Sequence, residues 1–359
     1  MSGGEKPRAL IAMSGGVDSS VAALIAMRMG YECEGVTMDL LGDGGGAERV
    51  AGALGIPHKL IDLSKEFRER VVEPFVSSYE GGRTPNPCTL CNTYIKFGRL
   101  YDHMLAGGFD KLVTGHYARI EIGADGAHRL ARAFDVSKDQ SYFLYGLTRE
   151  KLEHILFPLG GLTKREVRGL ASEAGLESAE RRDSQDICFL QGGDHAGFIA
   201  AYRGKPPASG EFVDGAGRAL GKHDGIERYT IGQRKGLGMS FGRPLFVKEI
   251  RPETREVVLA DEEDVFASRV SIADVNWLTK SLPGTDEEQN KNFRAKIMIR
   301  YNTKPVWAKV SPAGERRVLA EFDTPVRAPA KGQAAVMYDG DVVLGGGTID
   351  AVSFNTGKI

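Results

Sequence analysis

The sequence predicts an α/β N-terminal domain built on a parallel sheet, followed by two smaller β-rich domains, the last of them barrel-like. Apolar strand-like runs alternate with helical stretches to about residue 200, and such alternation requires crossover connections between parallel strands. Beyond residue 204 the runs are short and separated by turns, as in small sheets and barrels. A chain of 359 residues is also too long to fold around a single small hydrophobic core. We expect domains at residues 1–203, 204–275 and 276–359.

The predicted sheet begins with a strand, a glycine turn and a helix that stops at Gly30. Further strands and helices follow, and a later run again leads from a strand into a glycine. The expected strands are Ala9–Met13, Glu34–Met38, His58–Leu63 and the run Lys111–His116, and the expected helices are Val21–Met29, Ala47–Leu54 and Tyr94–Leu105. In the β-rich part the expected strands are Glu256–Leu259, Arg294–Arg300 and Val306–Val310.

Composition places the chain among globular enzymes. Hydrophobic residues make up 42% and the formal net charge is −1, a combination that excludes disorder for most of the chain. No run approaches the roughly 20 apolar residues of a membrane helix, and the first residues do not resemble a signal peptide. We therefore expect a cytoplasmic protein with no membrane partner. The four cysteines, Cys33, Cys88, Cys91 and Cys188, are too few for a disulfide scaffold and indicate chemistry or core packing.

The six residues Ser14–Ser19 read SGGVDS and lie between a predicted strand and a helix. At this position glycines let backbone N–H groups approach an anion, and the helix N-terminus adds about half a positive charge. The hydroxyls of Ser14 and Ser19 can donate hydrogen bonds, and Asp18 can cap the helix or orient a cation. The spacing fits neither the Walker A motif nor the G-x-G-x-x-G turn. The alternative is an ordinary strand-to-helix turn.

This string resembles the pyrophosphate loop of the PP-loop, or N-type ATP pyrophosphatase, superfamily, which implies an adenine nucleotide alpha-hydrolase-like fold. Those enzymes split ATP between the α and β phosphates and transfer AMP to a substrate oxygen. The resemblance implies ATP as a substrate, with Mg²⁺ bridging its phosphates. The implied nucleotide-binding residues are Ala12, Met13, Ser14, Gly15, Gly16, Val17, Asp18, Ser19, Met38 and Gly115.

Two cysteines follow a proline-punctuated stretch, RTPNPCTLC, just before the predicted helix at Tyr94. A thiol at a helix N-terminus tends towards the nucleophilic thiolate, which makes Cys88 and Cys91 candidates for chemistry. Cys188 ends the string DSQDIC, and its alternative role is core packing beside Phe189. For Cys33, near the start of a strand, we expect core packing.

Five further strings occur in order behind the loop: RTPNP with the following C-N, TGHY, KDQSYFLY, DS-x-x-IC and IGQRKGL. Together they resemble the tRNA-specific 2-thiouridylase family along essentially the whole chain. That resemblance implies that the 2-carbonyl oxygen of the wobble uridine is adenylated and that sulfur then displaces AMP. The resemblance assigns the sulfur chemistry to two cysteines. Cys188 would receive a persulfide, and Cys91 would act as the nucleophile or resolving thiol. The cycle ends either in a Cys91–Cys188 disulfide or in release of sulfide that attacks the activated base.

The resemblance also implies the partners. They are tRNAs for lysine, glutamate and glutamine, and a sulfur donor such as a cysteine desulfurase, acting directly or through a relay. We expect the chain to act as a monomer. The residues implied for the target base and the tRNA are Asn86, Pro87, Cys88, His116, Lys138, Asp139, Gln140, Arg234, Lys235, Arg300, Tyr301 and Gln333.

One position departs from the family pattern, because Cys88 stands where many relatives carry an aspartate. Three thiols, Cys88, Cys91 and Cys188, could then hold a [4Fe-4S] cluster, so a cluster-dependent route remains an alternative to the persulfide route. Zinc suits the three thiols less well, because a closed structural site needs four ligands. A rival function, a PP-loop synthetase that forms an amide, would have no need for paired cysteines.

Overall fold

The structure is a computed structural model that describes residues 6–42, 46–176, 187–280 and 291–354. It forms two compact units. The first comprises Met1–Val71, Cys88–Gln185 and Asp341–Val343, and the second comprises Val72–Pro87, Asp186–Gly340 and Leu344–Ile359. The expected domain boundaries at residues 204 and 276 stay predictions.

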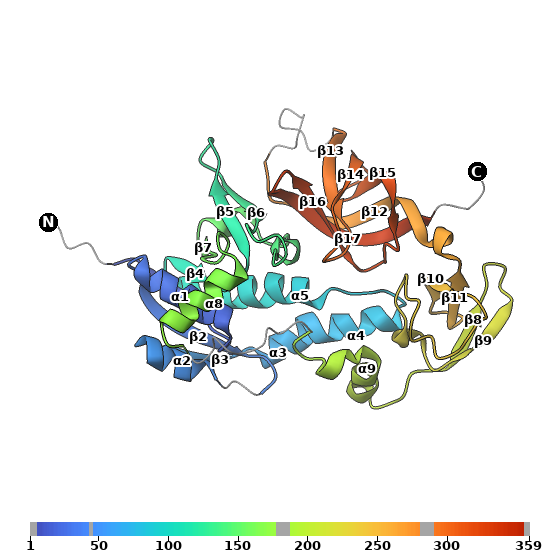
Figure 1. Cartoon of the computed structure of the whole chain (residues 1–359), viewed down its shortest axis with the longest axis horizontal. Coiled ribbons are helices and arrows are strands. Elements are labelled where there is room, and N and C mark those ends of the chain that lie inside the picture. The colour runs from blue at the N-terminus through green and yellow to red at the C-terminus, as the bar shows by residue number, and fades with distance from the viewer. Residues whose placement is uncertain (1–5, 43–45, 177–186, 281–290, 355–359) are drawn as a thin grey trace. The chain divides into compact units, whose positions relative to one another are not determined.

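The first unit contains the predicted parallel sheet (Figure 1). Its order is β3-β2-β1-β4-β7, and every neighbouring pair runs parallel. The strands are β1 (Arg8–Ala12), β2 (Glu32–Asp39), β3 (His58–Asp62), β4 (Lys111–Val113) and β7 (Ile155–Leu156). The α/β fold class predicted for the N-terminal part is therefore confirmed.

Three helices share one apolar core with the sheet. Ala9, Ile11 and Val113 of the strands pack with buried side chains of α1, α2 and α8. Because side chains of a strand alternate between its faces, Leu10 and Leu112, both fully buried, point to the other face. The helices of this region are α1 (Val17–Arg28), α2 (Ala47–Leu54), α3 (Ser64–Phe67), α5 (Pro87–Leu90), α6 (Leu100–Ala106), α7 (Arg149–Leu152) and α8 (Lys164–Glu173), with π-helical η1 (Arg68–Val72) and η2 (Cys91–Arg99) and the 3₁₀ turn η3 (Ser141–Phe143).

Two elements differ from the sequence prediction. Helix α1 begins at Val17, four residues earlier than expected, because Gly16 takes an extended conformation as its N-cap and lets the helix start inside the SGGVDS string. The helix expected to start at Tyr94 begins instead at Pro87 as α5, passes at Cys91 into a π-helical segment and continues as α6. Cys91 therefore lies inside a helical turn rather than in the loop before it.

An antiparallel hairpin in the first unit was not predicted. Strands β5 (Ala118–Ile122) and β6 (His128–Arg132) pair across a turn that contains Gly126 at φ +75°. Both strands are rich in charged residues, so they lack the apolar run that indicated the other strands. Asp341–Val343 also belongs to this unit, where Val342 pairs with Ala131 of β6.

The second unit holds two sheets, as predicted for the β-rich part. One is four-stranded with the order β10-β11-β8-β9, and the other is a six-stranded barrel that closes through β12 and β17. The strands are β8 (Gly210–Val213), β9 (Ala219–His223), β10 (Phe246–Arg251), β11 (Glu256–Ala260), β12 (Phe266–Trp277), β13 (Phe293–Met298), β14 (Val306–Pro312), β15 (Val318–Arg327), β16 (Ala334–Asp339) and β17 (Val342–Phe354). Each sheet has its own apolar core.

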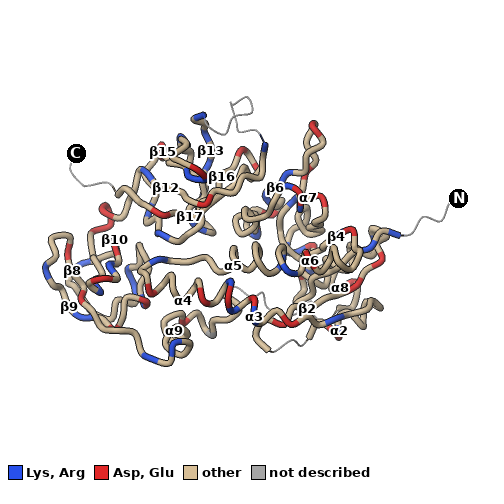
Figure 2. The backbone as a smooth tube through the Cα atoms, turned by 180° about the vertical axis from the view of Figure 1, so that it is seen from behind, with Lys and Arg blue, Asp and Glu red and all other residues tan. Residues whose placement is uncertain are grey.

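Helices α4 (Glu73–Glu80) and α9 (His195–Arg203) of the second unit are joined by one guanidinium group. Arg203 Nη2 donates to a carboxylate oxygen of Glu73 at 2.6 Å and of Glu80 at 2.9 Å. The short 3₁₀ segments are η5 (Gln191–Gly193), η6 (Ile226–Arg228) and η7 (Glu262–Val265). Basic and acidic residues are interspersed along the traces of both units (Figure 2). Within the described ranges, no helix combines the length and apolar character required to span a bilayer.

Candidate active site

The strand order places two loops at a point where open parallel sheets bind ligands. Strand β1 lies between β2 and β4, so the chain order reverses beside β1, and ligands bind outside the carboxyl ends of the strands at such a point. The loop Ser14–Ser19 follows β1, and the segment Thr114–His116 follows β4. A Cβ atom on Gly115 would lie 2.7 Å from the carbonyl carbon of Asp18. Only glycine fits there, so Gly115 lies directly against the loop, and its contact with a nucleotide stays a prediction.

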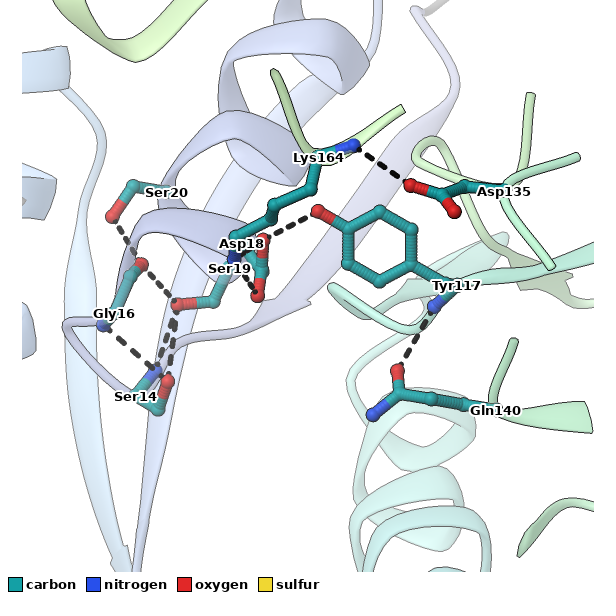
Figure 3. Close-up of polar contacts among 9 residues, drawn as sticks. All are labelled: Ser14, Gly16, Asp18, Ser19, Ser20, Tyr117, Asp135, Gln140 and Lys164. Atoms are coloured by element: carbon teal, nitrogen blue, oxygen red, sulfur yellow. Dashed lines mark hydrogen bonds and ion pairs between the residues drawn. The ribbon is translucent and has the colours of Figure 1, made fainter. Parts of the chain in front are cut away.

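The loop is shaped by its own hydroxyl groups (Figure 3). Ser19 Oγ accepts from the Ser14 N–H at 3.2 Å and donates to the Gly16 carbonyl at 3.1 Å. Gly15 has φ +75°, a conformation that favours glycine, and a Cβ there would lie 3.0 Å from the carbonyl carbon of Gly46. Among the residues that the structure describes, no side chain provides an N-cap hydrogen bond at Gly16, where α1 begins. The loop thus presents a glycine-lined helix N-terminus, which suits a phosphate group.

Asp18, in the first turn of α1, is clamped by two side chains from elsewhere in the unit. The Tyr117 hydroxyl donates to Asp18 Oδ1 at 2.8 Å, and Lys164 Nζ lies 2.8 Å from both carboxylate oxygens. The Lys164 side chain is 13% exposed and that of Asp18 is 34% exposed, so the pair is partly shielded from water. Asp18 does not cap the helix, and its carboxylate instead faces a fixed positive charge.

Lys164 is positioned by the start of α8. Thr163 and Glu166 form a capping box at that helix end. The backbone N–H of Lys164 donates to Asp135 Oδ2 at 3.2 Å (Figure 3). Because both the helix end and the backbone of its first residue are anchored, the lysine side chain reaches Asp18 from a fixed base.

The predicted tRNA-contacting stretch Lys138–Gln140 is tied to Tyr117. The Gln140 N–H donates to the Tyr117 carbonyl at 2.8 Å, and Gln140 Oε1 accepts from the Tyr117 N–H at 3.0 Å. The Asp139 carboxylate is buried and accepts from Arg132 Nε at 2.8 Å and from the Ser141 N–H at 3.1 Å. Asp139 therefore shapes this turn from inside, and Gln140 holds the residue that contacts Asp18. A tRNA contact by these residues stays a prediction.

His116 is enclosed in the first unit. Its ring lies 5.8 Å from the rings of both Phe97 and Phe157, and Nδ1 is 2.7 Å from the Thr114 hydroxyl. Burial, with a smaller contribution from the nearby positive charge of Lys96, holds the pKa of His116 well below its usual value. The imidazole is therefore neutral at pH 7, and its stacking on a tRNA base stays a prediction.

The cysteines have different environments. Cys91 is buried at the start of η2, Cys88 is half-buried, and Cys188 is exposed although the following Phe189 is buried. Cys188 is thus not a core-packing residue. Cys33 is buried as expected, and burial raises the pKa of its thiol to about 11. Over the part of the chain that the structure describes, no three His, Cys, Asp or Glu residues are grouped to hold a metal ion. Asp183–Asp186 of the DSQDIC string lies outside the described residues.

The other predicted RNA contacts lie in the second unit, and two of them link motifs that are distant in sequence. Gln333 Nε2 donates to the Pro85 carbonyl of the RTPNP stretch at 3.2 Å, and neighbouring Asn86 is half-buried while Pro87 is buried. Arg300 Nη2 donates to the Ile231 carbonyl at 3.3 Å, at the start of the IGQRKGL string. That turn exposes Arg234 and Lys235, and Tyr301 follows Arg300 half-buried.

Three residues of the nucleotide loop's surroundings have no counterpart in the sequence analysis. Thr37 is buried and donates to the Met13 carbonyl at 2.9 Å, which anchors the end of β1 to β2 beside Met38. Tyr117 and Lys164 hold Asp18. The capping box before Lys164 and the TGHY string were visible signals, but neither indicates which distant residue the side chain contacts.

Family models match the chain in three consecutive segments. A "tRNA methyl transferase HUP domain" model matches residues 7–192, a "tRNA methyl transferase PRC-barrel domain" model matches residues 196–261, and an "Aminomethyltransferase beta-barrel domain" model matches residues 268–349. The first of these alone spans more than half of the chain. The segments follow the order of an α/β part, a small β-rich part and a closed barrel seen in the structure.

Curated relatives match from end to end. The "tRNA-specific 2-thiouridylase MnmA" of Clostridium botulinum is 42% identical, with 97% of this chain and 99% of the relative covered. Proteins of the same name from Carboxydothermus hydrogenoformans and Clostridioides difficile are each 43% identical, with 96% of this chain and 98% of the relative covered. This chain belongs to the tRNA-specific 2-thiouridylase (MnmA) family. The resemblance carried by the five strings is therefore confirmed, and the SGGVDS loop is the PP-loop of a member of that family.

Proposed function

We propose that this chain catalyses ATP-dependent 2-thiolation of the wobble uridine in tRNAs for lysine, glutamate and glutamine. The observation that carries the proposal is the end-to-end match to relatives named tRNA-specific 2-thiouridylases, at 42–43% identity. The geometry of the first unit supports it, because a glycine-lined loop at the reversal point of the sheet suits a nucleotide. The amide-forming synthetase lacks comparable support.

In the first proposed step, the 2-carbonyl oxygen of uridine attacks the α-phosphorus of ATP. A phosphorus–oxygen bond forms, pyrophosphate leaves, and the uridine becomes an O-adenylate. The α1 N-terminus and the hydroxyls of Ser14 and Ser19 would stabilise the leaving pyrophosphate, because preorganised donors act where negative charge develops. Mg²⁺ bound with the nucleotide would screen its phosphate charges. Asp18 fits such an ion poorly as a ligand, because the Lys164 ammonium already lies 2.8 Å from both of its carboxylate oxygens.

In the second proposed step, the terminal sulfur of a persulfide on Cys188 attacks C2 of the activated uridine, and AMP leaves with the former carbonyl oxygen. The Cys91 thiolate then attacks the Cys188 sulfur, which releases 2-thiouridine and forms a Cys91–Cys188 disulfide. A thiol reductant must reduce that disulfide before the next cycle. The exposure of Cys188 supports this assignment, because a sulfur donor must reach the thiol that it loads.

We further propose that a cysteine desulfurase supplies the sulfur, directly or through a relay, and that the chain works in the cytoplasm as a monomer. The reason for the choice of donor is chemical, because a persulfide needs a donor that already carries sulfur in the same oxidation state. The cluster-dependent alternative would require Cys88, Cys91 and Cys188 to bind one [4Fe-4S] cluster. We place the reaction on the two thiols Cys91 and Cys188 instead.

Substitution of single cysteines tests the proposal. Purified protein, ATP, an unmodified tRNA transcript and a persulfide donor are combined, and 2-thiouridine is measured by mercury-affinity electrophoresis. Cys91→Ser and Cys188→Ser should each lower thiolation at least 100-fold while AMP formation persists, because only sulfur transfer needs the thiols. Cys33→Ser is the matched control, and it should leave activity intact since that thiol is buried and protonated.

Cys88→Ala separates the two sulfur routes in the same assay. Retained thiolation with no iron bound after anaerobic purification agrees with the persulfide pair. Loss of thiolation together with loss of stoichiometric iron would replace it with the cluster-dependent route. Full activity in both Cys91→Ser and Cys188→Ser would contradict the proposed sulfur chemistry altogether.

A further inference from the structure

An exposed tryptophan on the outer face of the barrel carries the further inference. Trp307 of β14 is 42% exposed, which is unusual for the largest side chain in a sheet whose inner face is fully packed. The chain has only two tryptophans, and the other, Trp277, packs against the barrel core. Trp307 therefore adds little to the core and leaves an aromatic surface facing outward.

Two cations flank this ring. Arg294 Cζ lies 5.6 Å and Lys296 Nζ 5.4 Å from the centre of the indole, both within cation–π range. The strand register explains the arrangement, because Lys296 pairs with Trp307 and Arg294 pairs with Lys309 across β13 and β14. Residues between them, such as Ala295 and Ala308, point into the core. The four outward residues Arg294, Lys296, Trp307 and Lys309 form what we term the barrel patch.

The barrel patch retains positive charge after its internal pairs are counted. Arg294 forms an ion pair with Asp323 of β15, and its side chain is still 56% exposed. Glu321, which lies opposite Lys309 in the sheet, pairs with Arg269. Among the described residues, neither Lys296 nor Lys309 has a carboxylate at ion-pair distance. Two ammonium groups thus remain for an anionic partner beside an exposed aromatic ring.

We propose that the barrel patch binds tRNA, with a nucleotide base stacked on Trp307 and the adjoining phosphates held by Lys296, Lys309 and Arg294. The proposal rests on the proposed function, which requires a tRNA partner. Sequence-tolerant RNA binding combines aromatic stacking platforms with basic side chains that follow the backbone. The patch lies on the hairpin whose loop contains Arg300 and Tyr301, two of the residues predicted to contact tRNA, so it would extend that contact along the strands.

Tryptophan fluorescence of the full-length chain tests the proposal. In a Trp277→Phe variant, Trp307 is the sole tryptophan, and an unmodified tRNA transcript should quench its emission as a base stacks on it. In Trp307→Phe, where only Trp277 remains, the same tRNA should change the emission little. Dextran sulfate, a polyanion without bases, should occupy the cations of the Trp277→Phe variant without comparable quenching.

Affinity measurements complete the test. Trp307→Ala should weaken tRNA binding about fivefold or more, and Lys296→Gln should lower the slope of log affinity against log salt by about one. Lys222→Gln removes an exposed lysine from β9 of the other sheet and should have a smaller effect on both quantities. Circular dichroism and the melting temperature establish that each variant is folded.

The outcomes separate this inference from the proposed function. If the wild-type chain thiolates tRNA but tRNA neither quenches Trp307 nor binds Trp307→Ala more weakly, the patch proposal is wrong and the function stands. Equal quenching by dextran sulfate also overturns base stacking. If the wild-type chain neither binds nor thiolates tRNA, the proposed function fails, and the patch proposal fails with it.

Discussion

Asp18 shows how a loop residue acquires a defined role through distant side chains. Its carboxylate would otherwise swing freely at the start of α1, but the Tyr117 hydroxyl and the Lys164 ammonium fix both oxygens. Hydrogen bonds to a charged group contribute about 1.5–3 kcal/mol when shielded from water, and partial exposure of Asp18 reduces that value. The clamp therefore preorganises the loop more than it stabilises the fold.

Removal of the tyrosine hydroxyl tests the clamp. Tyr117→Phe should lower kcat/KM for ATP about 5- to 10-fold, because a loop whose Asp18 carboxylate must be reoriented loses part of its preorganisation. The KM for tRNA should stay unchanged, and an unchanged melting temperature excludes a general folding defect. Steady-state kinetics with AMP as the measured product gives both values.

Two variants of Lys164 test whether the positive charge beside Asp18 supports the reaction. Lys164→Met should reduce kcat/KM for ATP more than Tyr117→Phe, and Lys164→Arg should restore part of the loss. Arg165→Met removes the exposed neighbouring cation and serves as the matched control. Wild-type kinetics in both Tyr117→Phe and Lys164→Met would show that the clamp does not support the reaction.

The loop could be predicted from the sequence, but the two side chains that hold Asp18 could not. The glycines at 15, 16 and 115 follow from local requirements for backbone approach, which a strand–glycine–helix pattern indicates. Tyr117 and Lys164 lie 99 and 146 residues from Asp18, and no local pattern encodes which distant side chains meet. The exposure of Cys188 excludes the core-packing role that Ile187 and Phe189 on either side left as the alternative.

Helices α4 and α9 illustrate stabilisation at the scale of elements. Arg203 closes the last turn of α9 and reaches two carboxylates one helix away, Glu73 and Glu80. Its hydrogen bond is the main cause that lowers the pKa of Glu73, while partial burial acts in the opposite direction. The ring of Phe75 on α4 packs edge-on against the rings of Phe189 and of Phe198 on α9, so apolar and ionic contacts hold the same two helices.

Loss of this guanidinium should destabilise the second unit measurably. Arg203→Met should lower the free energy of unfolding by about 1 kcal/mol at pH 7, as expected for a partly exposed ion-pair network. Since the folded-state pKa of Glu73 lies below its unfolded value, this stabilisation is present above the unfolded pKa and disappears as pH falls through the folded one. The difference from wild type should therefore shrink as the pH falls below about 4.3, the ordinary pKa of a glutamate, and vanish below the lower folded-state pKa.

Urea unfolding at pH 7 and pH 3.5 measures this difference. Lys205→Met, just beyond the same helix and exposed, controls for loss of a cation without the network. A difference that persists undiminished at pH 3.5 would mean that Arg203 acts through packing of its aliphatic stem rather than through the carboxylates.

Elements with a strong apolar pattern were predictable, and those without one were not. Strands β1 to β4 and the barrel strands β13 and β14 were expected within a few residues of their observed bounds. The β5–β6 hairpin was not predicted because charged residues interrupt its apolar alternation. The start of the helix at Pro87 was also not predicted, since the proline-punctuated stretch before Tyr94 has the composition of a loop, and Cys91 therefore lies inside the helix.

At the scale of the whole molecule, the fold assigns different tasks to its two units. The first unit supplies the sheet reversal point and the nucleotide loop, and the second supplies a closed barrel with a basic and aromatic outer face. Fold class was predictable because alternation of strands and helices changes to short strands near residue 204. The closure of the barrel was harder to predict, because the pairing of β12 with β17 joins strands far apart in the chain.

We propose above all that this chain uses its loop to split ATP between the α and β phosphates and thereby replaces one uridine oxygen with sulfur. The most direct test measures AMP, pyrophosphate and 2-thiouridine together, with unmodified tRNA, a persulfide donor and ATP labelled at the α-phosphate. We predict one AMP and one pyrophosphate per 2-thiouridine, with none of the three formed in excess while tRNA is saturating. Formation of ADP and phosphate, or of 2-thiouridine without any cleavage of ATP, would exclude the proposed adenylation.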